Sequence, residues 1–143
     1  MINLSNSKST NTLKDIALII VRVFVGFAML SHGFPKLQML LEGGEIQFIN
    51  FLGLGPKISL FLAVFGEFVC SIFLILGLFT RPAVIFLIIT MVTAAFIAHG
   101  GDPFAKKEMS LLYLSLYVLF LAFGAGKYSI DGLIHHRKQK NAW

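Results

Sequence analysis

Residues 16–30 read IALIIVRVFVGFAML, an apolar run with an arginine, Arg22, near its centre. A guanidinium inside such a run costs at least about 2.5 kcal/mol on membrane insertion, so it is expected to face protein or trapped water and to have an acidic partner. The acid inside another apolar run of the chain is Glu67. This stretch therefore predicts a membrane helix that packs against the helix carrying Glu67.

The composition supports a membrane protein. The chain has 143 residues, room for one domain, and is 57% hydrophobic and only 13% charged. A spanning helix needs about 20 mostly apolar residues. Four apolar runs reach that length, alone or with their flanks: residues 16–30, 58–79, 83–98 and 109–125. We predict an all-α fold, an integral membrane four-helix bundle.

Several other classes of protein are excluded or disfavoured. The net charge of +5 arises from lysines and arginines at the predicted membrane edges, and no basic patch is interleaved with exposed aromatic residues, so nucleic acid is not expected as a partner. The single cysteine, Cys70, lies in an apolar run and cannot form an internal disulfide. The first run has no small-x-small cleavage site, which indicates a retained helix rather than a signal peptide.

The pattern divides the chain into three parts. Residues 1–12 form a polar tail that we expect to be disordered, 13–127 form the transmembrane domain, and 128–143 form a basic amphipathic tail with His135 and His136. Within the domain we expect Pro35 to end the first helix. The connection 34–57 is apolar enough to be interfacial or re-entrant, or to cap the bundle; capping is favoured. The expected helices are 13–33, 58–79, 83–99 and 109–125.

The distribution of basic residues predicts the orientation. If both termini face the cytoplasm, the inner side carries seven lysines and arginines and the outer side carries four. This bias favours the cytoplasmic (inner) membrane of a bacterium with both termini inside. The inner group is Lys8, Lys14, Arg81, Lys127, Arg137, Lys138 and Lys140, and the outer group is Lys36, Lys57, Lys106 and Lys107.

Arg22 and Glu67 are predicted to form an ion pair. Counting residues from the ends of their runs places Arg22 roughly 9 Å from the inner face and Glu67 roughly 13.5 Å from the outer face of a core of about 30 Å. The pair would either serve a binding site or simply fix how the two helices pack. Gly26 and Gly33 share a helix face with Arg22, and small residues there allow another helix to come close.

A second polar group is expected at the outer end. His32 and Lys36 lie near the end of the first helix, His99 and Asp102 near the end of the third, and Glu108 at the start of the fourth. Two histidines at matching heights could ligate a haem iron or another metal, but histidines at helix ends are more often interfacial. We therefore predict no metal and no intrinsic cofactor. A polar pocket for a quinone or a lipid head group fits better, because it needs only donors, a cation and an apolar slot.

The ordered set of motifs resembles the DoxX family of small four-helix bacterial membrane proteins. The set covers about residues 13–131, and no single motif in it is specific. It comprises Arg22 with Gly26, His32-Gly33-x-x-Lys36, Glu67, Gly77-Leu-x-Thr-Arg81, Met91 with His99, Glu108, and Tyr128-Ser129-Ile130-Asp131. The resemblance implies a role as the small membrane subunit of a quinone-linked thiosulfate oxidation system, or in membrane complexes that respond to oxidative and thiol stress.

Two functions follow as hypotheses. In the first, the chain is the membrane subunit of a redox assembly, at most a non-autonomous part of an enzyme, and its polar seam of Arg22, His32, Lys36, Glu67, His99 and Glu108 binds a quinone or a lipid. In the second, the chain is a non-catalytic scaffold or anchor whose basic tail meets a partner. A transporter is disfavoured, because one short bundle has no second repeat to move against unless it forms a homo-oligomer.

Overall fold

The computed structural model describes residues 5–140. Its regular elements within this range are all helical, which confirms the all-α prediction. Its longest element is α1 (Ser5–Glu42), which continues through Pro35. The prediction that Pro35 ends this helix is wrong. Proline removes only one backbone donor, and contacts of Gly33 and Lys36 with a neighbouring helix hold the last turns in place. Residues 5–12, predicted as disordered, belong to α1, while 1–4 lie outside the described residues.

Four further long helical segments follow α1, two of them containing a π-helical stretch. The elements are η1 (Phe51–Gly53), α2 (Pro56–Val64), the π-helix η2 (Phe65–Val69), α3 (Cys70–Leu76), α4 (Thr80–Val92), the π-helix η3 (Thr93–Ala98), α5 (Phe104–Phe123) and α6 (Ile130–Lys140). The basic tail predicted from residue 128 is thus α6, with Arg137, Lys138 and Lys140 in its last turn.

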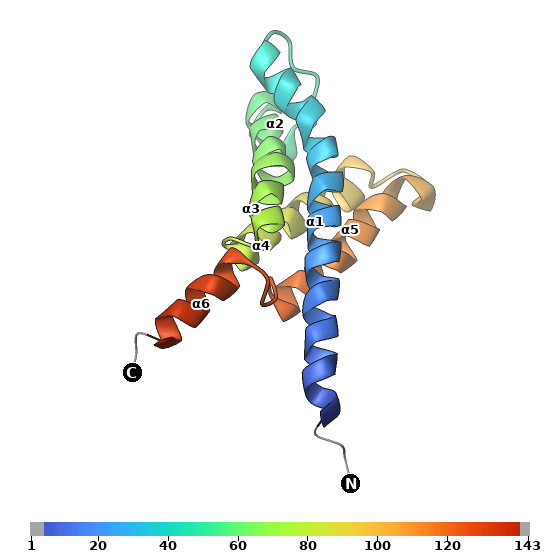
Figure 1. Cartoon of the computed structure of the whole chain (residues 1–143). Helices are drawn as coiled ribbons and strands as arrows, with labels where there is room; N and C mark the ends of the chain where they lie inside the picture. Colours follow the sequence, from blue (N-terminus) through green and yellow to red (C-terminus); the bar gives the residue numbers. More distant parts are fainter. Residues whose placement is uncertain (1–4, 141–143) are drawn as a thin grey trace.

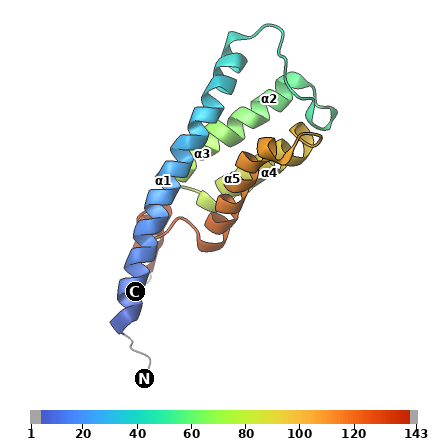
Figure 2. The ribbon, with the colours of Figure 1, turned by 90° about the vertical axis from the view of Figure 1, so that its right-hand side faces the viewer.

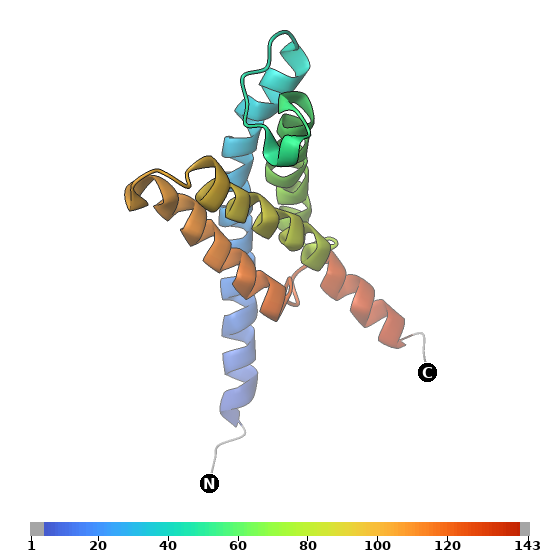
Figure 3. The ribbon, with the colours of Figure 1, turned by 180° about the vertical axis from the view of Figure 1, so that it is seen from behind.

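The helices pack in sequence order. The continuous segment α2–η2–α3 lies along α1, α3 and η2 contact α4, and α4 pairs with α5 (Figures 1 and 2). The start of α1 and the end of α6 point to the same end of the molecule, called here the terminal end (Figure 1). The connections before α2 and before α5 lie toward the opposite, loop end, and α6 extends away from the other helices (Figure 3).

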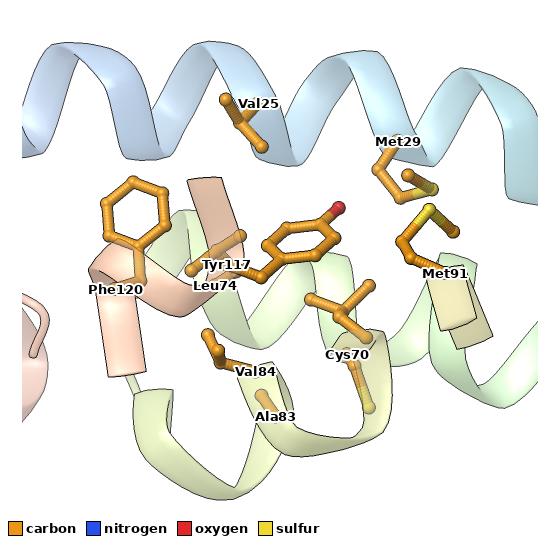
Figure 4. Close-up of a cluster of buried hydrophobic side chains, with 10 residues drawn as sticks. Val25, Met29, Cys70, Leu74, Ala83, Val84, Met91, Tyr117 and Phe120 are labelled. Atoms are coloured by element: carbon orange, nitrogen blue, oxygen red, sulfur yellow. The ribbon is translucent and has the colours of Figure 1, made fainter. Parts of the chain in front are cut away.

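The core lies where α1, α3, α4 and α5 meet. Tyr117 of α5 is fully buried at its centre, between Val25 of α1 and residues of α3 and α4 (Figure 4). The other buried members are Met29, Cys70, Leu74, Ala83, Val84, Leu87, Met91 and Phe120. Side chains of α5 thereby reach α1 across the molecule, which joins the helix pairs into one unit.

Within residues 5–140, two helical segments are long and apolar enough to cross a membrane. They are Pro56–Leu76, with a mean hydropathy of 2.4, and Thr80–Ala98, with 2.1. Large apolar side chains are also exposed on the outside of the other two long helices, among them Phe24 (73% exposed) and Phe27 on α1 and Leu112 and Phe123 on α5. A soluble monomer rarely exposes so much contiguous apolar surface.

Two glycines of α1 allow a close helix contact, as the sequence predicted. A Cβ on Gly33 would lie 2.8 Å from the backbone carbonyl carbon of Glu67, and one on Gly26 would lie 2.4 Å from Ile75 Cγ1. The neighbour of Gly33 is backbone, which cannot move aside as a flexible side chain can. The π-helix η2 is therefore held directly against α1.

Replacing Gly33 by alanine is expected to destabilise the protein by about 1–3 kcal/mol, because the methyl group forces α1 and η2 apart. The higher helix propensity of alanine, about 1 kcal/mol, opposes part of this loss. Thermal unfolding in detergent measures the effect. Gly101→Ala is the matched control, since nothing lies within 4 Å of a Cβ at that position. Equal melting temperatures for both variants would contradict the tight contact.

Candidate functional site

Glu67 pairs with Lys36. Lys36 Nζ donates to Glu67 Oε1 at 2.5 Å, and the side chains are 29% and 4% exposed, respectively. The second carboxylate oxygen, Oε2, is buried and has no hydrogen-bond partner among the described residues. The predicted Arg22–Glu67 ion pair is therefore wrong: the cation that balances the buried carboxylate comes from the last turns of α1.

The geometry of α1 explains this correction. Gly33, not Arg22, lies beside the Glu67 backbone. Gly33 is eleven residues after Arg22, which is about 16 Å along α1. Helical side chains also lean toward the N-terminus of their helix. Arg22 consequently reaches away from Glu67, whereas Lys36 reaches back toward it. The depth count set Glu67 roughly 16 Å from the level of Ile16, whereas Gly33, which lies beside Glu67, is 17 residues or about 25 Å along α1 from Ile16.

Arg22 binds the segment that follows α5. Its guanidinium donates to the carbonyl oxygens of Ala125, at 2.5 Å, and Tyr128, at 2.9 Å, and the residue is 2% exposed. The carboxylate of Asp131 supplies a compensating negative charge. The direct partners of Arg22 are thus backbone carbonyls of the C-terminal segment rather than the carboxylate that the sequence predicted.

Asp131 also caps α4. Its carboxylate accepts hydrogen bonds from the backbone N–H groups of Phe79 and Thr80, each at 2.9 Å, and its own N–H donates to Gly77 O. A carboxylate at a helix N-terminus satisfies free donors and the helix dipole together. Gly77 has φ +64, and a Cβ there would lie 2.6 Å from Arg22 Nη1. We call Arg22, Gly77, Ala125, Tyr128 and Asp131 the C-terminal clasp.

Two cavities meet at the Lys36–Glu67 pair, toward the loop end. The first, about 410 Å³, is lined by residues of α1, α4, η3 and α5; the second, about 450 Å³, is mostly apolar and lies beneath Phe48, Ile49 and Phe51. Lys36, Glu67, Ala94 and His99 line both. The connection before α2 therefore contributes Phe48, Ile49 and Phe51 to the wall of the second cavity, and its predicted capping of the bundle stays a prediction.

Both π-helices border these cavities. Glu67 lies within η2, and η3 supplies Ala94 and ends directly before His99. A π turn carries one extra residue per turn and redirects the side chains that follow it, and such turns are frequent at functional sites. The local backbone thus turns Glu67 toward α1 and His99 toward the shared region of the two cavities.

The structure brings together four of the six residues predicted for the polar seam. His32, Lys36, Glu67 and His99 line the first cavity. Arg22 belongs instead to the C-terminal clasp. Glu108 is exposed and lines neither cavity. It lies one turn into α5, where it faces solvent rather than the neighbouring helices.

His99 is oriented by Asp102, which lies beyond the end of the predicted helix 83–99. His99 Nδ1 and Asp102 Oδ2 are 2.8 Å apart, and Lys106 Nζ lies 3.9 Å from the same carboxylate oxygen. The hydrogen bond from His99 lowers the pKa of Asp102, and the neighbouring lysines act in the same direction. Asp102 is therefore ionised at neutral pH and fixes the histidine ring.

Sequence reasoning missed several residues of the first cavity. Met29, Met91, Met109 and Tyr113 line it. Tyr113 contacts the His32 ring edge-to-face and stacks on Tyr117, whose buried hydroxyl has no partner among the described residues. Met91 was named only through the family resemblance, together with His99. Apolar residues at helical spacing normally indicate a core, so the sequence did not separate Met29, Met109 and Tyr113 from ordinary packing residues.

A model of the DoxX family matches residues 17–100 of this sequence, which is more than half of the chain. The chain belongs to the DoxX family. The relatives of this DoxX protein include an uncharacterized protein of Haemophilus influenzae, 33% identical over 124 residues, or 80% of this chain and 87% of the relative. The inner membrane protein YphA of Escherichia coli is 35% identical over 91 residues, 62% of this chain and 64% of YphA. No solved structure gives a significant match.

This DoxX protein is accordingly a membrane protein. The matched range includes Arg22, Lys36, Glu67 and His99, whereas Asp131 lies beyond it. The Lys36–Glu67 pair and the lining of the second cavity thus lie within the matched range, whereas α5, beyond it, completes the wall of the first cavity. The clasp joins the matched range to the C-terminal segment.

Proposed function

We propose that this DoxX protein is a four-helix protein of the bacterial inner membrane that binds a quinone and serves as the membrane subunit of a redox assembly. The four spans would be α1, α2–η2–α3, α4–η3 and α5. The exposed apolar residues of α1 and α5 support the two spans that are less apolar overall. The name of the Escherichia coli relative supports the location, and the shared end of α1 and α6 suits cytoplasmic termini.

The observation that carries the binding proposal is the meeting of the two cavities at Lys36 and Glu67. The second cavity offers an apolar slot for a tail, and the Lys36 ammonium offers a donor at its polar end. Buried ionisable groups in membrane helices are costly and usually mark a ligand or ion pathway. A ligand with an apolar tail and a hydrogen-bond-accepting head matches this arrangement.

The chemistry follows from the charges around the head group. Reduction of a quinone builds negative charge on its oxygens, which Lys36 is placed to stabilise while Glu67 keeps the empty site neutral. His32 and His99 both line the first cavity and are the groups available to exchange protons. Electrons would come from a partner oxidoreductase.

Photolabelling tests this proposal. An azido-quinone is expected to label peptides containing Phe48–Phe51 or Ala94–His99 in the protein reconstituted in lipid nanodiscs. Ala94→Phe fills the region shared by both cavities and should weaken quinone binding at least tenfold. Ala122→Phe, at an exposed position on α5, is the control and should bind normally. Labelling spread over the whole lipid-facing surface, unchanged by Ala94→Phe, would contradict the proposal.

The scaffold hypothesis predicts a different dependence on the tail. Deleting residues 135–143 removes most of α6 but keeps the clasp residue Asp131. A redox subunit should retain quinone binding and function after this deletion. If function is lost while quinone binding is retained, the tail contacts an essential partner and the chain acts as an anchor.

A further inference from the structure

The first cavity is unusually rich in thioether sulfur. Three of the five methionines of the chain, Met29, Met91 and Met109, line it. Met29 and Met91 are 1% and 4% exposed, and Figure 4 shows their side chains pointing toward one another from α1 and α4. Thioether sulfur is a soft ligand that selects Cu(I) among biological metal ions.

A histidine that is hydrogen-bonded to a carboxylate lines the same cavity. His99 lines it, and the Nδ1 atom of His99 is held by Asp102 at 2.8 Å. This contact leaves Nε2 available as a ligand. Metal-binding histidines nearly always donate a hydrogen bond from their other ring N–H to a carboxylate, a backbone carbonyl or water. This bond fixes the tautomer and increases the basicity of the ligating nitrogen.

The remaining donors favour a soft monovalent ion over a harder divalent one. Within residues 5–140 no group of three or more histidine, cysteine and acidic side chains is arranged to hold a metal. The charges bordering the cavity are paired, Lys36 with Glu67 and Lys106 with Asp102. Neutral sulfur and imidazole ligands in a charge-balanced cavity suit Cu(I), whereas Zn²⁺ and Mg²⁺ require carboxylate, thiolate or further imidazole ligands.

We propose that Met29, Met91 and His99 form a binding site for Cu(I). Met109, 55% exposed, and the exposed His32 line the same cavity nearer the surface and provide an entry path. The site goes beyond the proposed function and does not depend on it: the quinone would use Lys36, and His32 stays free for proton exchange when His99 holds the metal.

Competition with a chromophoric chelator tests the site directly. Full-length protein, purified in detergent and freed of quinone, is titrated anaerobically against the Cu(I)–bicinchoninate complex. One Cu(I) per chain is expected to transfer. Met29→Leu and Met91→Leu, which preserve side-chain volume, should each weaken binding at least tenfold, and Asp102→Asn should weaken it 10- to 100-fold by releasing the histidine.

Two controls make the outcome decisive. Met39→Leu alters a methionine of α1 that lines neither cavity, and Cys70→Ala removes the buried thiol; both should bind as the wild type does. X-ray absorption of the Cu(I)-loaded wild type should show sulfur together with nitrogen scatterers, a result that does not require any variant to fold. Absence of transfer, or transfer abolished by Cys70→Ala and unaffected by Met29→Leu and Met91→Leu, would overturn the proposal. Quinone photolabelling stays a separate measurement.

Discussion

Replacing Lys36 with methionine is expected to lower the free energy of unfolding by about 3–5 kcal/mol, because it leaves the Glu67 carboxylate buried without its cation. Glu67→Leu should cost less, since Lys36 is partly exposed and its long side chain can turn toward the interface. The double variant Lys36→Met/Glu67→Leu should recover most of the loss. Reversible unfolding in mixed detergent measures all three.

The matched control for this series is Lys57→Met, which removes an exposed lysine of α2. It should leave the stability within about 0.5 kcal/mol of the wild type. Coupling between the Lys36 and Glu67 variants of less than about 0.5 kcal/mol would mean that the pair contributes little, and the carboxylate would then need another partner.

Arg22→Met is expected to release the C-terminal segment and to destabilise the protein by about 2–6 kcal/mol, because two carbonyl oxygens lose their charged donor. Limited proteolysis should then cut within residues 126–134, where the wild type is expected to resist cleavage. Arg81→Met, at an exposed arginine near the start of α4, is the control and should retain the wild-type cleavage pattern. Equal resistance in both variants would contradict the role of Arg22 in the clasp.

The same variants distinguish the two pairings of Glu67. Gly33, which lies against the Glu67 backbone, is about 16 Å along α1 from Arg22, so the effects of Arg22→Met and Glu67→Leu on stability should add. The sequence-based hypothesis of an Arg22–Glu67 pair requires instead that the double variant be more stable than either single one. A double-mutant cycle measures this difference directly.

The sequence predicted the helical architecture because four apolar runs separated by glycine, proline and charge leave few alternatives. It also predicted the close approach at Gly26 and Gly33, since small residues at helical spacing have few other uses on a membrane helix. Four residues of the polar seam, His32, Lys36, Glu67 and His99, likewise lie together.

The wrong pairing had an identifiable cause. Residue counts place a side chain along a helix only if the helix ends are known, and α1 extends nine residues beyond the predicted end at Gly33, to Glu42. The π turn at η2 also changes which residues of the second helical segment share a face, and no residue type predicts such a turn. Asp131 was named only as part of the Tyr128-Ser129-Ile130-Asp131 motif. Its capping role was not predicted, because its partners are the backbone N–H groups of Phe79 and Thr80, 52 and 51 residues away, which side-chain patterns do not reveal.

The clasp has a consequence for how the protein is made. Arg22 leaves the ribosome 103 residues before Ala125, the carbonyl that it binds in the finished molecule. Until Ala125 and Tyr128 have been synthesised, α1 carries a guanidinium whose two carbonyl partners do not yet exist. Chains terminated before these residues would keep that charge without its partners, and in the proposed four-span arrangement this would give membrane quality control a physical basis for separating incomplete molecules from complete ones.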